Sequence, residues 1–508
     1  MKRVAALIAI LSVVSFPGMA QKRPTSFPVK QTENPDYWRS AGKNAVSAAK
    51  DRSFKRRKAK NVILFVGDGM GVSTLTAARI LEGQLRGESG EENLLSFERF
   101  PFSALSRTYS ANQQTSDSAP TMSAIITGMK TNEGLISVNN NGVFGDYSTL
   151  AGNEAETLIE MAESKGRSTG VISTARLTHA TPAACYSHSI DRNWESDAYI
   201  AARAPEAHKA GAKDIARQLI EFDKGNGLEV AMGGGRSFFL PKDTSDPEYK
   251  DKNGVRLDGR DLTSEWVKKH KNSSYVWDKA GFDSIDVSKT DHLLGLFERS
   301  HMQYEADRKN DGAGEPSLTE MTTKSIDLLS KNKKGYVLVV EAGRIDHAHH
   351  DGNAYRALTD TIELSNAVRA ARSKVDLKDT LIIVTADHSH TFTIAGYPAR
   401  GNNILGLVRE VAPGGKSEKD AALDKNKMPY TTLRYADGPG ARGGERKALS
   451  DDEVTDPDFK QEATIPLSSE THGGEDVAIF ADGAGSYLFS GSMEENWIFW
   501  YMRDALRF

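Results

Sequence analysis

Several short segments of this chain are apolar throughout, where a half-buried strand would alternate apolar and polar residues. They span residues 62–66, 170–173, 229–232, 337–340, 381–384 and 477–481. A strand of this kind must be buried on both faces, which is typical of parallel sheets. Helical patterns lie between these segments, over 155–165, 316–330 and 353–372. The alternation predicts an α/β fold with a doubly wound, mostly parallel sheet and helices on both faces.

Three of these segments end in side chains that commonly bind metal ions. The residues are Asp68 after the first segment, Glu341, Asp346, His347 and His350 after the fourth, and Asp387 and His388 after the fifth. Ligands of open α/β sheets bind beyond the carboxyl ends of the strands. We therefore expect these carboxylates and imidazoles to meet at one edge of the sheet.

The spacing of these residues narrows the chemistry. Asp346 and His350 are four residues apart, so one face of a helical turn presents both to the same ion. Oxygen and nitrogen ligands without thiolates suit Zn²⁺ with an open position, or Mg²⁺ where carboxylates dominate. Each motif alone has an ordinary explanation, since an Asp-Gly pair is usually a turn and a histidine cluster often lies on the surface. Their combination at three strand ends predicts a site for several metal ions.

Ser118 is the candidate nucleophile. Pro120 fits the first turn of a helix, which places the Ser118 hydroxyl at the helix N-terminus, where backbone N–H groups can hold an anion. The alternative is that Ser118 only caps the helix. A serine hydroxyl becomes a nucleophile when a neighbouring metal lowers its pKa.

The first twenty residues have the pattern of a secretory signal. Lys2 and Arg3 precede an apolar stretch over 4–16, and small residues stand at Gly18 and Ala20. We expect cleavage near Ala20 and export to a periplasm or out of the cell; the alternative is an N-terminal membrane anchor. No later stretch reaches about 18 consecutive apolar residues, so no stable membrane span is expected.

Charge and cysteine content exclude other classes. The net charge is −4 with a pI of 6.3, and the basic run over 55–58 lacks interleaved aromatic residues, so no nucleic-acid partner is expected. Cys185 is the only cysteine, so the chain cannot form an internal disulfide. An exported protein of this kind must gain its stability from a large core or from metals.

Ordered motifs along the whole chain resemble the alkaline phosphatase family, and the animal form more than the enteric bacterial one. They are residues 33–38 (ENPDYW), 344–350 (RIDHAHH), 396–401 (GYPARG) and 471–476 (THGGED). The resemblance implies one catalytic domain over 21–508 that hydrolyses phosphate monoesters at alkaline pH through a phosphoserine. It also implies that two stretches outside the alternating pattern, 241–316 and 400–466, are insertions, the second forming a crown-like subdomain.

The resemblance assigns a role to each site residue. Asp346, His350 and His472 match a first zinc site; Asp68, Asp387 and His388 match a second; and Asp68, Thr181 and Glu341 match a magnesium site. Ser118 matches the phosphorylated nucleophile and Arg192 the arginine that binds the phosphate. His179 and His347 match residues just outside the ligand sets. His179 stands where the enteric enzyme has Asp, which leaves the identity of the third metal open.

Three further expectations come from the same resemblance. Glu248, Phe297, Glu298 and Glu315 match a calcium site within 241–316, the alternative being ordinary surface acids. The protein should be a homodimer with residues 34–50 at the interface. Tyr397 matches a tyrosine that reaches the active site of the partner subunit.

Rival functions remain open at this point. A diesterase or sulfatase of the same superfamily is the nearest, but Met122 stands where the sulfatase motif needs Arg. Arg192 favours a terminal, dianionic phosphate over a diester. The other alternative is a metal-bearing binding protein without turnover.

Overall fold

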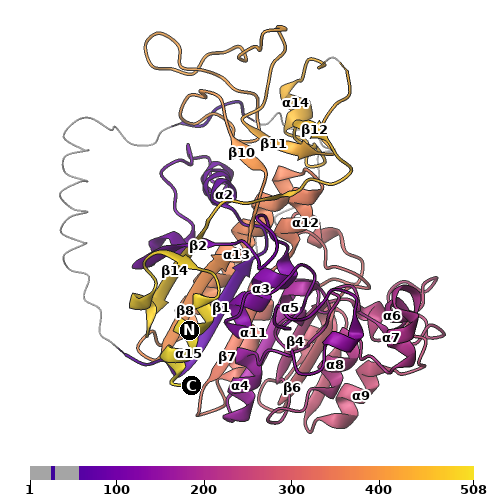
Figure 1. The fold of residues 1–508 in the computed structure, drawn as a ribbon. Helices are drawn as coiled ribbons and strands as arrows, with labels where there is room; N and C mark the ends of the chain where they lie inside the picture. Colours follow the sequence, from indigo (N-terminus) through magenta and orange to yellow (C-terminus); the bar gives the residue numbers. More distant parts are fainter. Residues whose placement is uncertain (1–23, 29–56, 445) are drawn as a thin grey trace, which may run out of the picture.

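The computed structural model describes residues 24–28, 57–444 and 446–508 (Figure 1). Two expectations therefore lie outside the described residues: the secretory signal over 1–20 and the dimer contact over 34–50. Among the described residues, no helix has both the length and the apolar character needed to cross a membrane.

A ten-stranded sheet forms the centre of the molecule, in the order β15-β2-β14-β8-β1-β7-β3-β4-β6-β5. Its strands are β1 (Asn61–Gly67), β2 (Phe102–Arg107), β3 (Ser168–Arg176), β4 (Val230–Gly234), β5 (Ser273–Val276), β6 (His292–Leu296), β7 (Tyr336–Ala342), β8 (Thr380–Ala386), β14 (Val477–Gly483) and β15 (Gly491–Glu494). Every neighbouring pair is parallel except the two that β14 forms with β8 and β2. The carboxyl ends of nine strands therefore share one edge of the sheet.

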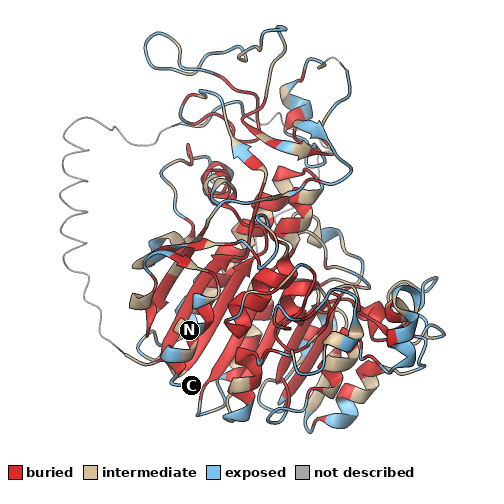
Figure 2. Ribbon diagram, in the orientation of Figure 1, coloured by how far each residue is buried: buried red, intermediate tan, exposed pale blue. Residues whose placement is uncertain are grey.

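Helices cover both faces of this sheet. The described α-helices are α2 (Val72–Leu85), α3 (Ser118–Thr127), α4 (Leu158–Ser164), α5 (Ala180–Ala183), α6 (Asp197–Arg203), α7 (Pro205–Lys209), α8 (Ile215–Glu221), α9 (Leu262–Lys269), α10 (Lys279–Ser284), α11 (Leu318–Leu329), α12 (Arg344–His350), α13 (Ala354–Lys374), α14 (Asp451–Val454) and α15 (Trp497–Leu506). Side chains of β1 alternate between two buried clusters: Val62 and Leu64 pack with α3, α4 and α15, whereas Ile63 and Phe65 pack with α2, α11 and α13. Figure 2 shows the resulting buried central sheet. The doubly wound α/β prediction is confirmed.

Each of the predicted apolar segments forms part of a strand: β1, β3, β4, β7, β8 and β14. Strands β2, β5, β6 and β15 were not predicted. Two of them, β5 and β6, lie within 241–316 and extend the main sheet beyond β4. The predicted helices correspond to α4, α11 and α13.

A smaller subdomain projects from the carboxyl edge of the sheet (Figure 1). It contains a three-stranded sheet of β10 (Phe392–Ile394), β11 (Leu433–Gly438) and β12 (Ala463–Pro466), together with α14. Its apolar cluster combines Leu407, Leu449, Val454 and Phe459. Two more short strands, β9 (Ser389–His390) and β13 (His472–Gly473), form a separate antiparallel pair.

Candidate metal centre

The carboxyl edge of the sheet gathers the residues that the sequence singles out. Asp68 follows β1, Glu341 lies near the end of β7, and Asp387 and His388 follow β8. Helix α12, which begins directly after β7, carries Asp346 and His350. His472 arrives from β13, and Ser118 begins α3.

The first cluster joins Asp346, His350 and His472. The Nε2 atoms of the two histidines are 3.1 Å apart, and they lie 3.3 Å and 3.4 Å from Asp346 Oδ1. Ligands of a tetrahedral zinc ion with bonds of about 2.0–2.1 Å lie about 3.3 Å from one another. The three donor atoms therefore have the spacing that one zinc ion requires.

The second cluster joins Asp68, Asp387 and His388, and all three side chains are buried. His388 Nε2 lies 3.3 Å from Asp68 Oδ1 and 3.5 Å from Asp387 Oδ2. Ser118 Oγ is 3.1 Å from the same His388 nitrogen and 3.3 Å from Asp68 Oδ1. The serine hydroxyl thus occupies the position that a fourth ligand of this cluster would take.

Ser118 is not the cap of its helix. Asp117 is the N-cap residue of α3, and its side chain accepts a hydrogen bond of 2.7 Å from the Ala119 N–H group. The Ser118 hydroxyl is therefore free of that role and faces the second cluster. Asp117 therefore caps the helix in place of Ser118.

A third group consists of buried oxygen atoms without partners. Asp68 Oδ2, Thr181 Oγ1 and Glu341 Oε1 have no hydrogen-bond partner among the described residues. The other oxygen of Glu341 accepts a hydrogen bond from Ser173. Buried polar atoms are rarely left unpaired, and an ion is one explanation of such exceptions. An all-oxygen set suits a hard cation such as Mg²⁺.

The charge balance of the site also calls for cations. Burial, followed by the nearby carboxylate of Asp387, raises the pKa of Asp68 well above its usual value. Burial raises the pKa of Glu341 to about 7, and Asp387 adds to the effect. Carboxylates crowded in a low-dielectric site repel one another unless positive charge compensates them. Divalent cations would supply that charge.

Arg192 lies beside Asp117, the residue before Ser118. Its guanidinium lies 3.5 Å from Asp117 Oδ1 and 3.2 Å from His179 Nε2. The rings of His179, His347 and His301 form a compact group with centroid separations of 4.0–5.3 Å. Burial, reinforced by the charge of Arg192, lowers the pKa of His179 well below its usual value. His179 therefore presents a neutral ring beside the guanidinium.

Two functional residues escaped sequence analysis. His390 Nε2 lies 2.8 Å from Asp346 Oδ1, so this imidazole joins the first cluster. Glu470 contacts His390 from the other side, at 2.5 Å. His390 could have been found, because it lies two residues beyond His388 in a segment already rich in imidazoles. Glu470 offers no signal except that it precedes His472.

The predicted calcium ligands are only partly brought together. One carboxylate oxygen each of Glu248, Glu298 and Asp311 lie within 4.8 Å of one another. Asp311 was not predicted. Glu315 has one oxygen bound to the Gln303 N–H group at 2.8 Å, and its other oxygen is buried without a partner. Burial raises the pKa of Glu315 to about 9.

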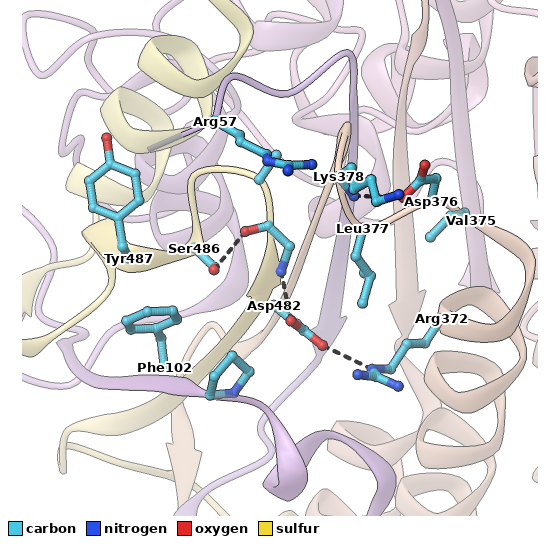
Figure 3. A pocket seen from close by; sticks show the side chains of 13 residues that line it. Arg57, Phe102, Arg372, Val375, Asp376, Leu377, Lys378, Asp482, Ser486 and Tyr487 are labelled. Carbon is cyan, nitrogen blue, oxygen red and sulfur yellow. Dashed lines mark hydrogen bonds and ion pairs between the residues drawn. The ribbon is translucent and has the colours of Figure 1, made fainter. Parts of the chain in front are cut away.

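A separate cavity of about 620 Å³ lies near the start of β8 and the end of β14, at the opposite edge of the sheet (Figure 3). Arg57, Phe102, Arg372, Asp482 and Tyr487 are among its lining residues. Among these lining residues, Arg372 Nε donates a hydrogen bond of 2.9 Å to Asp482 Oδ2. This cavity contains none of the predicted metal ligands, so it is not the candidate site.

The fold and this site together define the chain as an α/β enzyme whose candidate active site surrounds a serine with metal-ligating side chains. It belongs to the alkaline phosphatase family, whose model matches residues 59–508. This confirms the resemblance found in the sequence, and with it the enzyme class: a phosphatase that acts on phosphate monoesters.

Curated relatives agree with this assignment. The tissue-nonspecific alkaline phosphatase of Rattus norvegicus is 44% identical over 482 residues, which cover 93% of this chain and 88% of the relative. The alkaline phosphatase of Gadus morhua is 43% identical over 480 residues, covering 93% and 97%. These identities to animal enzymes are consistent with the resemblance to the animal form that the sequence motifs indicate.

Solved structures share the fold. The alkaline phosphatase of Thermus thermophilus superimposes with a TM-score of 0.62 at 23% identity, covering 91% of this chain and 94% of that one. The alkaline phosphatase of the Antarctic bacterium TAB5 gives a TM-score of 0.58 at 21% identity, covering 89% and 99%.

Proposed function

We propose that this chain hydrolyses phosphate monoesters in two steps through a phosphoserine at Ser118, with two Zn²⁺ ions and one Mg²⁺ ion per subunit. The observation that carries the proposal is the position of the Ser118 hydroxyl. It lies 3.1 Å from His388 and 3.3 Å from Asp68, within a donor set that has the spacing of a zinc site.

The residues fit the proposed ions. The three donor spacings of the first cluster match tetrahedral zinc, His388 Nε2 has similar spacings to Asp68 and Asp387 in the second, and the three orphaned oxygens suit magnesium. Asp346, His350 and His472 would hold one zinc, Asp68, Asp387 and His388 the other, and Asp68, Thr181 and Glu341 the magnesium. When bound, such ions lower the pKa of a coordinated hydroxyl and stabilise the entering and leaving oxygens of an in-line displacement.

The chain itself positions the phosphate. Helix α3 directs the N–H groups of its first turn toward the site, and its dipole favours an anion there. The Arg192 guanidinium can bind two phosphate oxygens in a planar fork. Thr121 Oγ1 donates to Asp387 Oδ2 at 3.1 Å and the Gly69 N–H group donates to Asp387 Oδ1 at 3.1 Å, so Asp387 is held in one orientation.

The two displacements balance as follows. Ser118 Oγ loses its proton and forms a bond to phosphorus, while the ester P–O bond breaks and the alcohol leaves with a proton. Water then attacks the phosphoserine, the Ser118 P–O bond breaks, and phosphate is released. Two in-line displacements retain the configuration at phosphorus. The transition state needs chiefly positioning and charge stabilisation.

Substitution of the nucleophile tests this scheme. Ser118→Ala should abolish labelling of the protein by ³²P-phosphate and remove most turnover of an aryl phosphate. Ser123→Ala is the matched control, because Ser123 lies on the same helix and its hydroxyl binds the Ala119 carbonyl oxygen at 2.7 Å, away from the clusters. Labelling that survives in Ser118→Ala contradicts the phosphoserine.

Substrate comparison tests the class. The purified enzyme should turn over an aryl phosphate faster than the corresponding diester or sulfate. A preference for either of the latter would favour the diesterase or sulfatase alternative. Absence of any turnover with zinc and magnesium supplied would favour a binding protein.

Four further proposals concern the rest of the protein. We propose that Ca²⁺ binds near Glu248, Phe297 and Glu298, with Asp311 as an added ligand and Glu315 beside it; equilibrium binding of ⁴⁵Ca²⁺ tests this. We propose a homodimer, in which Tyr397, 84% exposed in the single chain, reaches the partner subunit; sedimentation equilibrium tests it. We propose that the catalytic domain spans 21–508, with its crown formed by 400–466. N-terminal sequencing of the exported protein tests cleavage near Ala20.

A further inference from the structure

We infer that Glu470 is a positioning residue for the first metal cluster, acting through His390 on Asp346. The inference rests on the proposed function, because the cluster matters only if it holds an ion. Glu470 is 1% exposed and lies two residues before His472. It touches none of the three proposed zinc-binding atoms directly, so its influence must pass through other side chains.

The carboxylate of Glu470 makes three hydrogen-bond contacts, and its Oε2 also lies 3.9 Å from His350 Nδ1. Oε2 lies 2.5 Å from His390 Nδ1, while Oε1 accepts hydrogen bonds of 2.7 Å each from the Thr391 N–H group and hydroxyl. These contacts leave the carboxylate little freedom to rotate. It is therefore a fixed partner for the His390 ring.

The His390 ring bridges two carboxyl groups. Its Nδ1 faces Glu470 and its Nε2 lies 2.8 Å from Asp346 Oδ1. An ionised carboxylate can only accept hydrogen bonds, so Nε2 must carry the hydrogen that it donates to Asp346. The 2.5 Å contact between Nδ1 and Glu470 Oε2 requires a second hydrogen, carried by one of these two atoms, and it holds the ring in the orientation that makes the donation to Asp346 possible. Outer partners of this kind orient the ligands of metal sites.

The backbone of Glu470 orients a second ligand. His350 Nδ1 donates to the Glu470 carbonyl oxygen at 2.6 Å, and the Glu470 N–H group donates to the His350 carbonyl oxygen at 3.0 Å. This leaves His350 Nε2 to face the cluster. A side-chain substitution keeps these backbone contacts and changes only the carboxylate, whose Oε2 lies 2.5 Å from His390 Nδ1 and 3.9 Å from His350 Nδ1.

Glu470 also lies where the crown meets the metal centre. A Cβ atom added at Gly438, at the end of β11, would lie 2.9 Å from the Glu470 Cβ atom, so the crown strand packs closely against this residue. The next residue, Thr471, is held by Asp437 of the same strand through bonds of 2.9 Å and 2.7 Å. The alternative role for Glu470 is therefore purely structural, as an anchor for this junction.

A double-mutant cycle separates the two roles. Glu470→Gln, His390→Asn and the double variant are prepared metal-free, and their zinc affinity is measured by competition with a chromophoric chelator. Glu163→Gln serves as the control, because Glu163 is an equally buried carboxyl group at the opposite edge of the sheet. Circular dichroism and the melting temperature establish that each variant is folded.

If Glu470 acts through His390, Glu470→Gln lowers the affinity for the first zinc by about tenfold or more. The double variant should then be no weaker than His390→Asn by more than about twofold, because both changes break one path. Substituted Co²⁺ gives a second readout, since its visible absorption should change in Glu470→Gln and stay unchanged in Glu163→Gln.

Other results overturn the inference. Unchanged zinc affinity and Co²⁺ absorption in Glu470→Gln would show that the residue is only an anchor. Losses of zinc affinity that are additive in the double variant would also show that Glu470 does not act through His390. A parent chain that binds no zinc and forms no phosphoserine would instead refute the proposed function, and the inference with it. Should Glu470→Gln fail to fold, Glu470→Asp takes its place in the cycle with the same expectations.

Discussion

Glu163 and Glu229 form a buried carboxyl pair at the amino ends of β3 and β4, far along the sheet from the candidate metal centre. Thr169 donates to Glu163 through its hydroxyl at 2.6 Å and to Glu229 through its N–H group at 2.7 Å. Glu163 Oε2 is buried, and no described residue forms a hydrogen bond with it. Burial, followed by the charge of Glu229, raises the pKa of Glu163 to about 9.

This shift makes stability depend on pH in a definite direction. Below pH 4.5, the usual pKa of Glu, both the folded and unfolded states hold the proton. Between pH 4.5 and about 9 the unfolded chain releases it while the folded chain keeps it. Stability therefore falls as pH rises through this window, by up to about 1.4 kcal/mol per pH unit and on the order of 5 kcal/mol in total.

Glu163→Gln removes this titration. For a chain of this length, about 1 kcal/mol corresponds to about 1 °C in melting temperature. The difference in melting temperature, variant minus parent, should therefore grow by about 5 °C between pH 5 and pH 9. Scanning calorimetry at fixed zinc and magnesium concentrations measures it, and the metal centre cancels because both proteins share it.

Glu160→Gln is the matched control on the same helix. His188 lies 3.3 Å from Glu160 and, against the opposing effect of burial, lowers the pKa of that carboxyl. A lowered pKa stabilises the fold above the unfolded-state value of 4.5, and this contribution is complete there, so between pH 5 and pH 9 the melting-temperature difference for Glu160→Gln should not grow as it does for Glu163→Gln. If Glu163→Gln shifts the melting temperature equally at every pH, the pair does not share a proton and the argument fails.

Three more outcomes are expected. Arg192→Lys should lower kcat/KM for an aryl phosphate by about 2 kcal/mol, roughly thirtyfold, because Lys cannot form the planar fork; steady-state kinetics measures this, and a loss under twofold would show that Arg192 does not grip the phosphate. Thr181→Val should weaken magnesium binding with little effect on zinc, which metal analysis after dialysis reports; equal loss of both ions would contradict a separate oxygen site. Arg256→Met should lower the free energy of unfolding by about 3–5 kcal/mol, because it leaves the buried Asp214 carboxylate, which Arg256 binds at 2.9 Å, without its cation. Urea unfolding measures this, and an unchanged free energy of unfolding would contradict it.

The strands of the sheet could be predicted to different extents, for a physical reason. Every residue of β1, β7 and β8 is buried, and such strands leave uninterrupted apolar runs in the sequence. Strand β2, near the sheet edge, has exposed residues between its buried ones, and β15 at the edge is short. Their composition does not distinguish them from loops. Only pairing with a neighbour defines them.

The site shows the same division. Asp68, Asp387 and His388 could be predicted because each directly follows a buried strand, where parallel topology carries it to the shared edge. His472 precedes β14, which runs in the opposite direction, so only family resemblance placed it. Glu470 could not be found at all, since its role depends on meeting His390 from a segment 80 residues away.

Three groups of carboxylates in this molecule, most of them buried, have their charge compensated in three different ways. Arg256 lies among Asp197, Asp214 and Asp258, so this acidic group has a permanent cation of its own and needs no metal. Glu163 and Glu229 rely on a retained proton, which is lost as pH rises through about 9. Asp68 and its neighbours at the carboxyl edge have imidazoles and unpaired oxygens around them instead.

Only the third arrangement leaves room for an ion whose charge does not titrate. A proton could compensate Asp68 and Glu341 at neutral pH, but the pKa of about 7 for Glu341 means that this proton is lost under alkaline conditions. Metal affinity rises as ligands lose their protons. Raising the pH should therefore strengthen the binding of the proposed cations over the range in which Glu341 loses its proton.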